Sequence, residues 1–176
     1  NKEISQYISK MIVHESDETG GTVFNDYYQI TGNIERISDH AMNISGYSKI
    51  EIIETEELMA PQSNSAAQNQ SVIDQESEHS LKKIKPTDYV ILLDLHGQTM
   101  TSEKFASKIN QVQIYNSSDI TFVIGGSLGV SEALRKRADF AWKLSDNTFP
   151  HQIVRLLVLE QVYRAFKILR NEPYHK

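Results

Sequence analysis

The second half of the chain alternates between apolar runs and helical patterns. Three runs are predicted to be strands: DYVILLDL at 88–95, DITFVI at 119–124 and FAWKLS at 140–145. The first two runs are continuous enough to be buried on both faces of a sheet. A helical pattern precedes each strand, at 71–85, 102–110 and 130–139. Strands that alternate with helices predict an α/β domain with a parallel sheet.

Shorter segments precede and connect these elements. The alternating, β-branched stretch KIEIIE, Lys49–Glu54, predicts a further strand. Residues 56–70 contain Pro61 and many Ser, Asn and Gln residues, which predicts a loop. His96-Gly97 is predicted to be a turn after the first buried strand.

The last 33 residues contain a polar loop followed by a long helix. Phe149-Pro150-His151 marks the start of this helix, because proline is tolerated in a first turn. From Ile153 to Leu159 the helix is apolar except for Arg155, so two of its faces need cover. One core covers one face, and the second face predicts a partner subunit. The alternative is a C-terminal docking helix whose arginines extend to solvent.

The first 48 residues have a helical pattern and no apolar strand. A turn around Gly20-Gly21 separates two predicted helices, and the second spans about 24–44. One turn of that helix brings Glu35, Asp39 and His40 close together. Such a cluster is usually a solvated face, so no metal site is predicted from it.

Charge is unevenly distributed along the 176 residues. The net charge is −5, but residues 135–176 hold 9 Lys and Arg against 4 Asp and Glu. The acidic total argues against non-specific nucleic-acid binding, whereas the basic last quarter permits a local phosphate-contacting face. The chain has no cysteine, which fits a reducing cytosol, and its apolar runs are too short to span a membrane.

Three predicted strand ends are candidates for ligand binding. They are Leu93-Asp94, Ile124-Gly125-Gly126 and the stretch Leu144 to Phe149, which lie at or just beyond the ends of the predicted strands. In parallel sheets, ligands bind outside the carboxyl ends of the strands. The Gly pair allows a backbone to approach a ligand closely, although a GGxxG loop alone is more often a tight turn.

Several motifs in order resemble one known family. The runs are DYVILLDLHGQTMTSEKFA, ITFVIGGSLGVSEALRKRAD and TFPHQIVRLLVLEQVYRAFKILRNEPYHK. They resemble the RlmH family of SPOUT-class methyltransferases over about residues 49–176. The resemblance implies a C-terminal trefoil knot, a cytoplasmic homodimer and S-adenosylmethionine as cofactor. It also implies methylation of N3 of a pseudouridine in large-subunit (23S) ribosomal RNA within the ribosome.

The same resemblance implies a set of cofactor-binding residues in the loops after the three strands. These are Leu93, Gly125, Leu144, Ser145, Asp146, Asn147, Thr148 and Phe149.

Removal of a proton from the reacting nitrogen calls for a base or an anion stabiliser in the tail or the last helix. His175 is a suitable base, Arg155 a suitable anion partner, and Tyr174 can stack on or orient the RNA base. The alternative for Tyr174 and His175 is a frayed terminus.

Residues 1–48 depart from this family, whose members open with a strand. The stretch NDYYQITGNIERISDHAMNI instead resembles a helix of the PhoU family. We therefore expect a helical appendage at 1–48, whether a natural fusion, an engineered chimera or an artefact. Two other hypotheses remain open: a non-enzymatic phosphate-signalling or metal-binding module, and an inactive fusion that keeps the knotted fold.

Overall fold

The computed structural model describes residues 46–56, 58, 65–115 and 119–175. The chain divides into two compact units, Asn1–Lys49 and Ile50–Lys176. All the described helices and strands belong to the second unit. The helices predicted for the N-terminal segment, with Glu35, Asp39 and His40, lie outside the described residues.

Three parallel strands form the sheet of the second unit. Strand β1 (Tyr89–Gln98) lies in the middle, between β2 (Ile120–Ile124) and β3 (Phe140–Trp142). Both neighbours pair with it in parallel. These strands confirm the α/β domain with a parallel sheet that the apolar runs predict.

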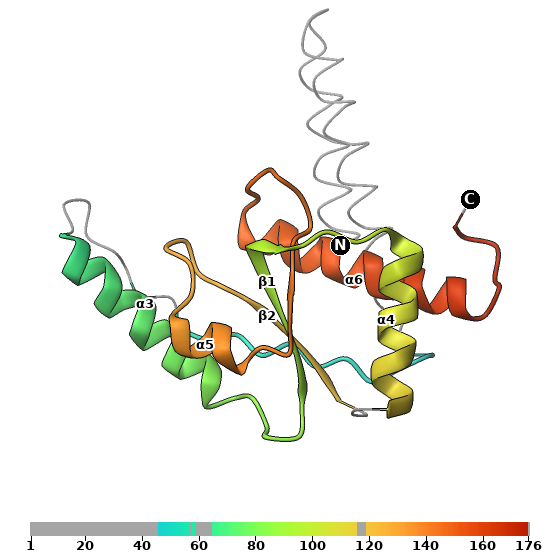
Figure 1. The fold of residues 1–176 in the computed structure, drawn as a ribbon, viewed down its shortest axis with the longest axis horizontal. Coiled ribbons are helices and arrows are strands. Elements are labelled where there is room, and N and C mark those ends of the chain that lie inside the picture. Colours follow the sequence, from blue (N-terminus) through green and yellow to red (C-terminus); the bar gives the residue numbers. More distant parts are fainter. Residues whose placement is uncertain (1–45, 57, 59–64, 116–118, 176) are drawn as a thin grey trace, which may run out of the picture. The chain divides into compact units, whose positions relative to one another are not determined.

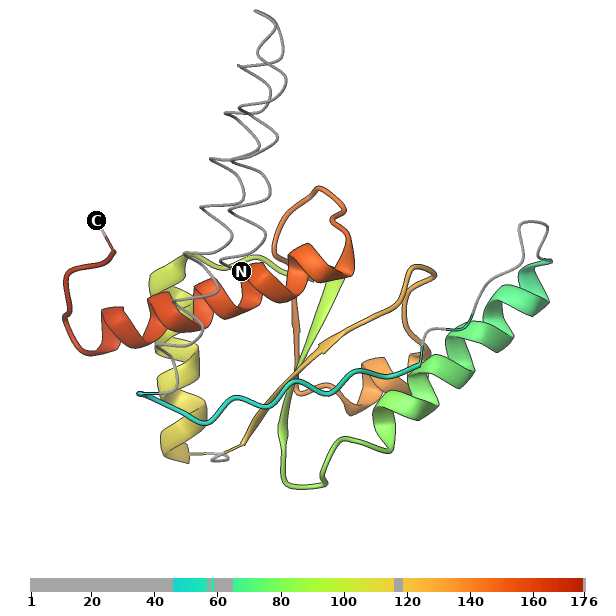
Figure 2. The same cartoon turned by 180° about the vertical axis from the view of Figure 1, so that it is seen from behind.

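Helices cover both faces of this sheet, as Figures 1 and 2 show. Helix α4 (Ser102–Tyr115) packs against α6 (His151–Leu169), and α3 (Ala66–Leu81) against α5 (Glu132–Arg137). Alternate residues of β1 enter the two cores.

Ile91 joins the core with α4 and α6, which also holds Phe105 and Trp142. Val90 and Leu92 join Leu134 of α5 in the other core. Burial of the strand on both faces explains why its sequence is continuously apolar.

The segment predicted as a strand at Lys49–Glu54 has no regular structure, and that prediction is wrong. Ile52 and Ile53 are each more than half exposed. An alternating pattern gives a strand only where a neighbouring strand supplies backbone hydrogen bonds. The strands of the described sheet are β1, β2 and β3, so the pattern at 49–54 predicts a strand that this sheet does not contain.

Local polar contacts shift two other predicted boundaries. Helix α3 starts five residues before Ser71 because Ser65 caps it: the Ser65 hydroxyl accepts from the Gln68 N–H at 3.3 Å, and the Gln68 side chain accepts from the Ser65 N–H at 2.8 Å. His96-Gly97 belongs to β1 instead of forming a turn. A side chain at Gly97 would lie 2.6 Å from the Ala141 carbonyl oxygen, so glycine permits the close contact with the chain around β3.

Within the described part of the chain, no helix is long and apolar enough to cross a bilayer. The described residues also contain no group of three His, Cys, Asp or Glu side chains that could hold a metal ion.

Candidate active site

A cavity of about 670 Å³ opens at the carboxyl ends of the three strands. Its walls come from the end of β1, the loop between β2 and α5, and the loop between β3 and α6. Parallel strands end at one edge of a sheet, which is why segments that are distant in the sequence, such as those around Leu93, Gly125 and Leu144, meet there. The cavity has the size of a small-molecule site, and its lining mixes apolar side chains with backbone.

The cavity brings together seven of the eight residues that the resemblance implies for cofactor binding. They are Leu93, Gly125, Leu144, Ser145, Asn147, Thr148 and Phe149. Asp146 lies in the same loop but does not line the cavity. Its side chain is 92% exposed and pairs with Lys143, whose hydrogen bond and charge lower the pKa of the Asp146 carboxyl.

The loop after β2 requires its glycines. A side chain at Gly125 would lie 2.6 Å from the Val130 side chain, and one at Gly126 would collide with the Glu76 carboxylate. Gly129 has a φ of +99°, a conformation that favours glycine, and its N–H bonds to the Gly126 carbonyl at 3.1 Å. The loop is therefore both a tight turn and a wall of the cavity.

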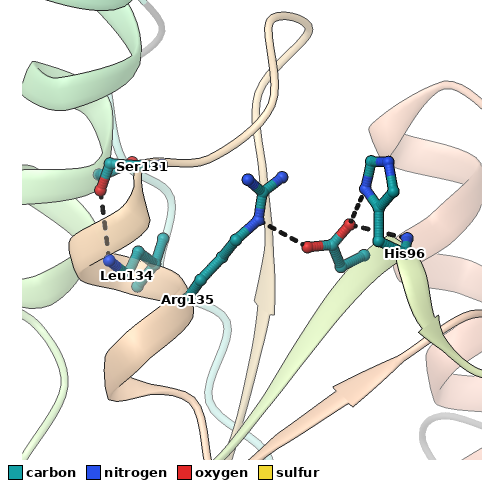
Figure 3. Close-up of polar contacts among 6 residues, drawn as sticks. His96, Ser131, Leu134 and Arg135 are labelled. Atoms are coloured by element: carbon teal, nitrogen blue, oxygen red, sulfur yellow. Dashed lines mark hydrogen bonds and ion pairs between the residues drawn. The ribbon is translucent and has the colours of Figure 1, made fainter.

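Glu76 and Ser77 of α3 support this loop from behind. The Glu76 carboxylate accepts from the Leu58 N–H at 3.0 Å and packs on Gly126. The buried Ser77 hydroxyl accepts from the Ser131 N–H at 2.8 Å, and the Ser131 hydroxyl in turn caps α5. Figure 3 shows this cap beside the polar groups of the cavity. Helix α3 thus fixes the start of α5.

A polar cluster that the sequence does not reveal lines the same cavity. The Asp94 carboxylate accepts from Arg135 Nε at 2.9 Å and from the His96 N–H at 3.0 Å (Figure 3). Burial of Asp94 favours the neutral acid, but hydrogen bonds from His96 and Arg135 outweigh it and lower the pKa of the carboxyl. The Asp94–Arg135 pair joins residues 41 positions apart, and no spacing motif marks such a pair.

Arg155 lies outside this cavity, in a smaller adjoining one of about 320 Å³. The smaller cavity lies behind the glycine loop and shares Gly125, Gly126 and His151 with the larger one. Arg155 Nη1 pairs there with the Glu54 carboxylate at 2.8 Å. The guanidinium and its partner are both well exposed, so an incoming anion can replace Glu54 at modest cost.

The C-terminal tail is folded back on α6. Asn171 has a positive φ of 53°, which reverses the chain after the helix. The Tyr174 hydroxyl donates to Glu160 at 3.1 Å, and its ring lies edge-on to Tyr163 at 4.9 Å. Burial, followed by the negative charge of Glu160, raises the pKa of Tyr174, so this hydroxyl remains a donor.

His175 bridges two helices. Its Nε2 lies 2.7 Å from the Glu103 carboxylate of α4, and its Nδ1 lies 3.3 Å from Arg164 of α6. Arg164 also pairs with Glu160, and its guanidinium covers the Tyr174 ring at 4.7 Å. The tail is therefore held by a polar network, which argues against a frayed terminus.

Within one chain, the three predicted catalytic residues do not come together. Arg155 is in the first turns of α6, whereas the tail leaves the far end of that helix (Figures 1 and 2). The helix rises about 20 Å between Arg155 and its last residue. Glu103, Glu160 and Arg164 contact the tail, and none of them is among the residues that line the cavity.

The fold and the cavity define a class that comparison with known proteins identifies. A family model described as "Predicted SPOUT methyltransferase" matches residues 30–175. The chain therefore belongs to the SPOUT methyltransferase family, and it is an S-adenosylmethionine-dependent enzyme. The match begins upstream of Lys49, earlier than the sequence motifs suggest.

Curated relatives are similar over most of their length. The chain is 45% identical over 142 residues to the "Ribosomal RNA large subunit methyltransferase H" of Carboxydothermus hydrogenoformans, which covers 81% of this chain and 89% of the relative. Proteins of the same name from Ruminiclostridium cellulolyticum and Latilactobacillus sakei are each 46% identical. Their alignments cover 81% and 80% of this chain, and 89% and 88% of the relatives.

Proposed function

We propose that this protein transfers a methyl group from S-adenosylmethionine to N3 of a pseudouridine in large-subunit (23S) ribosomal RNA. The names of relatives at about 45% identity, ribosomal RNA large subunit methyltransferases, support the RNA substrate. The observation that carries the proposal is the cavity at the strand ends, where seven predicted cofactor residues converge. The action of the enzyme on ribosomes in the cytoplasm is part of the same proposal.

The cavity fits the cofactor by shape and chemistry. Leu93, Leu144 and Phe149 offer apolar contacts, and the glycine loop brings backbone to the wall because no side chain intervenes. Held in this cavity, S-adenosylmethionine supplies an electrophilic methyl group. The contribution of the chain is then to position the RNA base in line and to keep water out.

The proton on N3 must leave as the new nitrogen–carbon bond forms. His175 is the proposed acceptor because a neutral imidazole nitrogen can act as a general base. Arg155 stabilises an RNA phosphate or the developing anion, and the protonated Tyr174 hydroxyl donates to or orients the base. These three roles need the tail to meet a cavity that it does not contact within one chain.

A homodimer solves this separation. We propose that two chains associate along the N-terminal half of α6, where Ile153 is 38% exposed, next to Phe149 of the preceding loop, which is 37% exposed. A second copy then supplies its tail to the cavity of the first. The trefoil knot is proposed for the segment after β3, whose Lys143 N–H bonds to the Gln98 carbonyl at 3.0 Å and so runs against the end of β1.

Residues 1–48 are proposed to form a helical, PhoU-like appendage to the SPOUT domain at 49–176.

The test is transfer of tritium from labelled S-adenosylmethionine to ribosomes that lack the modification. We expect label in large-subunit RNA, at one pseudouridine, with intact ribosomes as substrate. A chain that binds the cofactor but transfers no label would support the inactive-fusion hypothesis instead. A chain that binds no cofactor would support the non-enzymatic alternative.

A further inference from the structure

A single guanidinium faces the cofactor cavity. Among the described residues that line it, Arg135 is the only lysine or arginine. Its side chain is 41% exposed, so it remains accessible from the cavity. Nothing in the chemistry of the SPOUT domain described above uses this residue.

Asp94 holds Arg135 in one orientation. The Asp94 side chain is only 8% exposed, and its second oxygen is fixed by the His96 N–H at 3.0 Å. The ion pair uses only Nε of Arg135, at 2.9 Å. The terminal amino groups, which carry four of the five guanidinium N–H donors, point away from this contact (Figure 3).

A fixed guanidinium with two outward amino groups is suited to bind a carboxylate. Two parallel N–H donors match the two oxygens of a carboxylate, and the pair is stronger in a partly enclosed site than in water. The cofactor carries one carboxylate, on its methionine end. Asp94 alone would repel that group, so the pairing with Arg135 both neutralises Asp94 and directs the remaining donors to the ligand.

We propose that Arg135, positioned by Asp94, binds the α-carboxylate of S-adenosylmethionine. This inference rests on the assignment of the cavity to the cofactor under the proposed function. It makes Arg135 a cofactor-binding residue and Asp94 a positioning residue. It also orients the cofactor, because it directs the methionine end toward α5.

The test compares two ligands that differ only in this carboxylate. Calorimetry on the full chain measures the Kd of S-adenosylmethionine and of decarboxylated S-adenosylmethionine. Arg135→Gln should weaken the first by at least about tenfold, or roughly 1.4 kcal/mol, and change the second by less than about twofold. Lys136→Gln is the matched control, because it removes the same charge from an adjacent residue that is 75% exposed and outside the cavity.

A double variant isolates the role of Asp94. Arg135→Gln alone leaves the Asp94 carboxylate without its partner, and this charge could repel the ligand. Asp94→Asn combined with Arg135→Gln removes that charge, and the proposal expects the same selective loss for S-adenosylmethionine. Full recovery of affinity in the double variant would overturn the direct contact.

Three other outcomes also contradict the proposal. Unchanged affinity for both ligands would leave Arg135 outside the binding site while the cavity assignment stands. Unchanged cofactor affinity with weaker methyl transfer would assign the guanidinium to an RNA phosphate. Failure of the wild-type chain to bind either ligand would reject the cavity assignment itself, so the two failures can be told apart.

Discussion

The proposed cofactor cavity and the C-terminal tail are built in opposite ways. The cavity consists of backbone, glycines and apolar side chains that three parallel strands bring to one edge. The tail is held by side-chain ion pairs and hydrogen bonds around Glu160, Arg164 and Glu103. Contacts fixed by the sheet persist as long as the domain is folded, whereas the tail depends on individual side-chain contacts, of which the pair between His175 and the 59% exposed Glu103 is the one most readily exchanged. This contrast suggests a preformed cofactor site and a tail that can change partners.

The largest expected effect is the loss of cofactor affinity when one added side chain obstructs the cavity. Gly125→Val places a branched side chain against Val130, 2.6 Å from the Cβ position, and forces the loop into the cavity. S-adenosylmethionine affinity should fall by about 100-fold or more, roughly 2.7 kcal/mol. Calorimetry measures this loss, and Lys136→Gln, at a 75% exposed side chain outside the cavity, is the control that should retain binding. Wild-type affinity in Gly125→Val would show that the loop does not contact the cofactor.

The next largest expected effect is on methyl transfer, and it distinguishes the role of the tail from that of the cavity. Tyr174→Ala combined with His175→Ala should reduce methyl transfer to ribosomal RNA by at least about tenfold, or roughly 1.4 kcal/mol of transition-state stabilisation. Cofactor affinity should stay nearly unchanged, because the tail contacts do not line the cavity. Tritium transfer and calorimetry on the same protein measure the two quantities. Wild-type transfer would make the tail a purely structural element.

The proposed dimer would bring the tail of one copy to the cavity of the other. Light scattering at micromolar concentration should give about 40 kDa, twice the chain mass of 20.1 kDa. Ile153→Asp places a charge on the exposed apolar side of α6 and should shift the protein toward monomer. Loss of transfer together with retained cofactor binding is expected in that variant. A wild-type monomer that is fully active would contradict the shared site.

The smallest effect concerns the acid that holds the tail. A hydrogen bond from Thr101, a backbone hydrogen bond and the contact with His175 lower the pKa of Glu103 from 4.5 to about 2. A carboxyl with a lowered pKa stabilises the fold above its unfolded pKa and loses that contribution as pH falls toward 2. Carbon NMR should show the Glu103 carboxyl titrating near pH 2. His175→Ala should move that midpoint upward, and an unshifted midpoint would mean that the histidine contact does not persist in solution.

The strands, and the loops that begin at their carboxyl ends, were predictable from the sequence. Leu93, Gly125 and Leu144 lie at the ends of apolar runs, and parallel pairing of the strands places these ends at one edge of the sheet. The KIEIIE strand failed because alternation describes one strand and cannot supply its neighbour. The ion pair between Asp94 and Arg135 could not be predicted from the sequence, because it links distant positions through side-chain geometry alone. The residue types of the tail allowed chemical roles to be proposed for Tyr174 and His175. Their contacts could not be predicted, because they depend on the reversal of the chain at Asn171.

The hydrogen bond of the Ser77 hydroxyl links the substitutions that are tolerated at positions 77 and 131. It is the acceptor for the Ser131 N–H, 54 residues away and buried. A chain that lost this hydroxyl would keep a backbone donor sealed from water, at a cost of about 1–3 kcal/mol. Drift at position 77 is therefore tolerable only where a water molecule or a new acceptor takes over. Substitutions at this contact between α3 and α5 must therefore compensate each other. The glycine loop next to the two helices is subject to the same restriction.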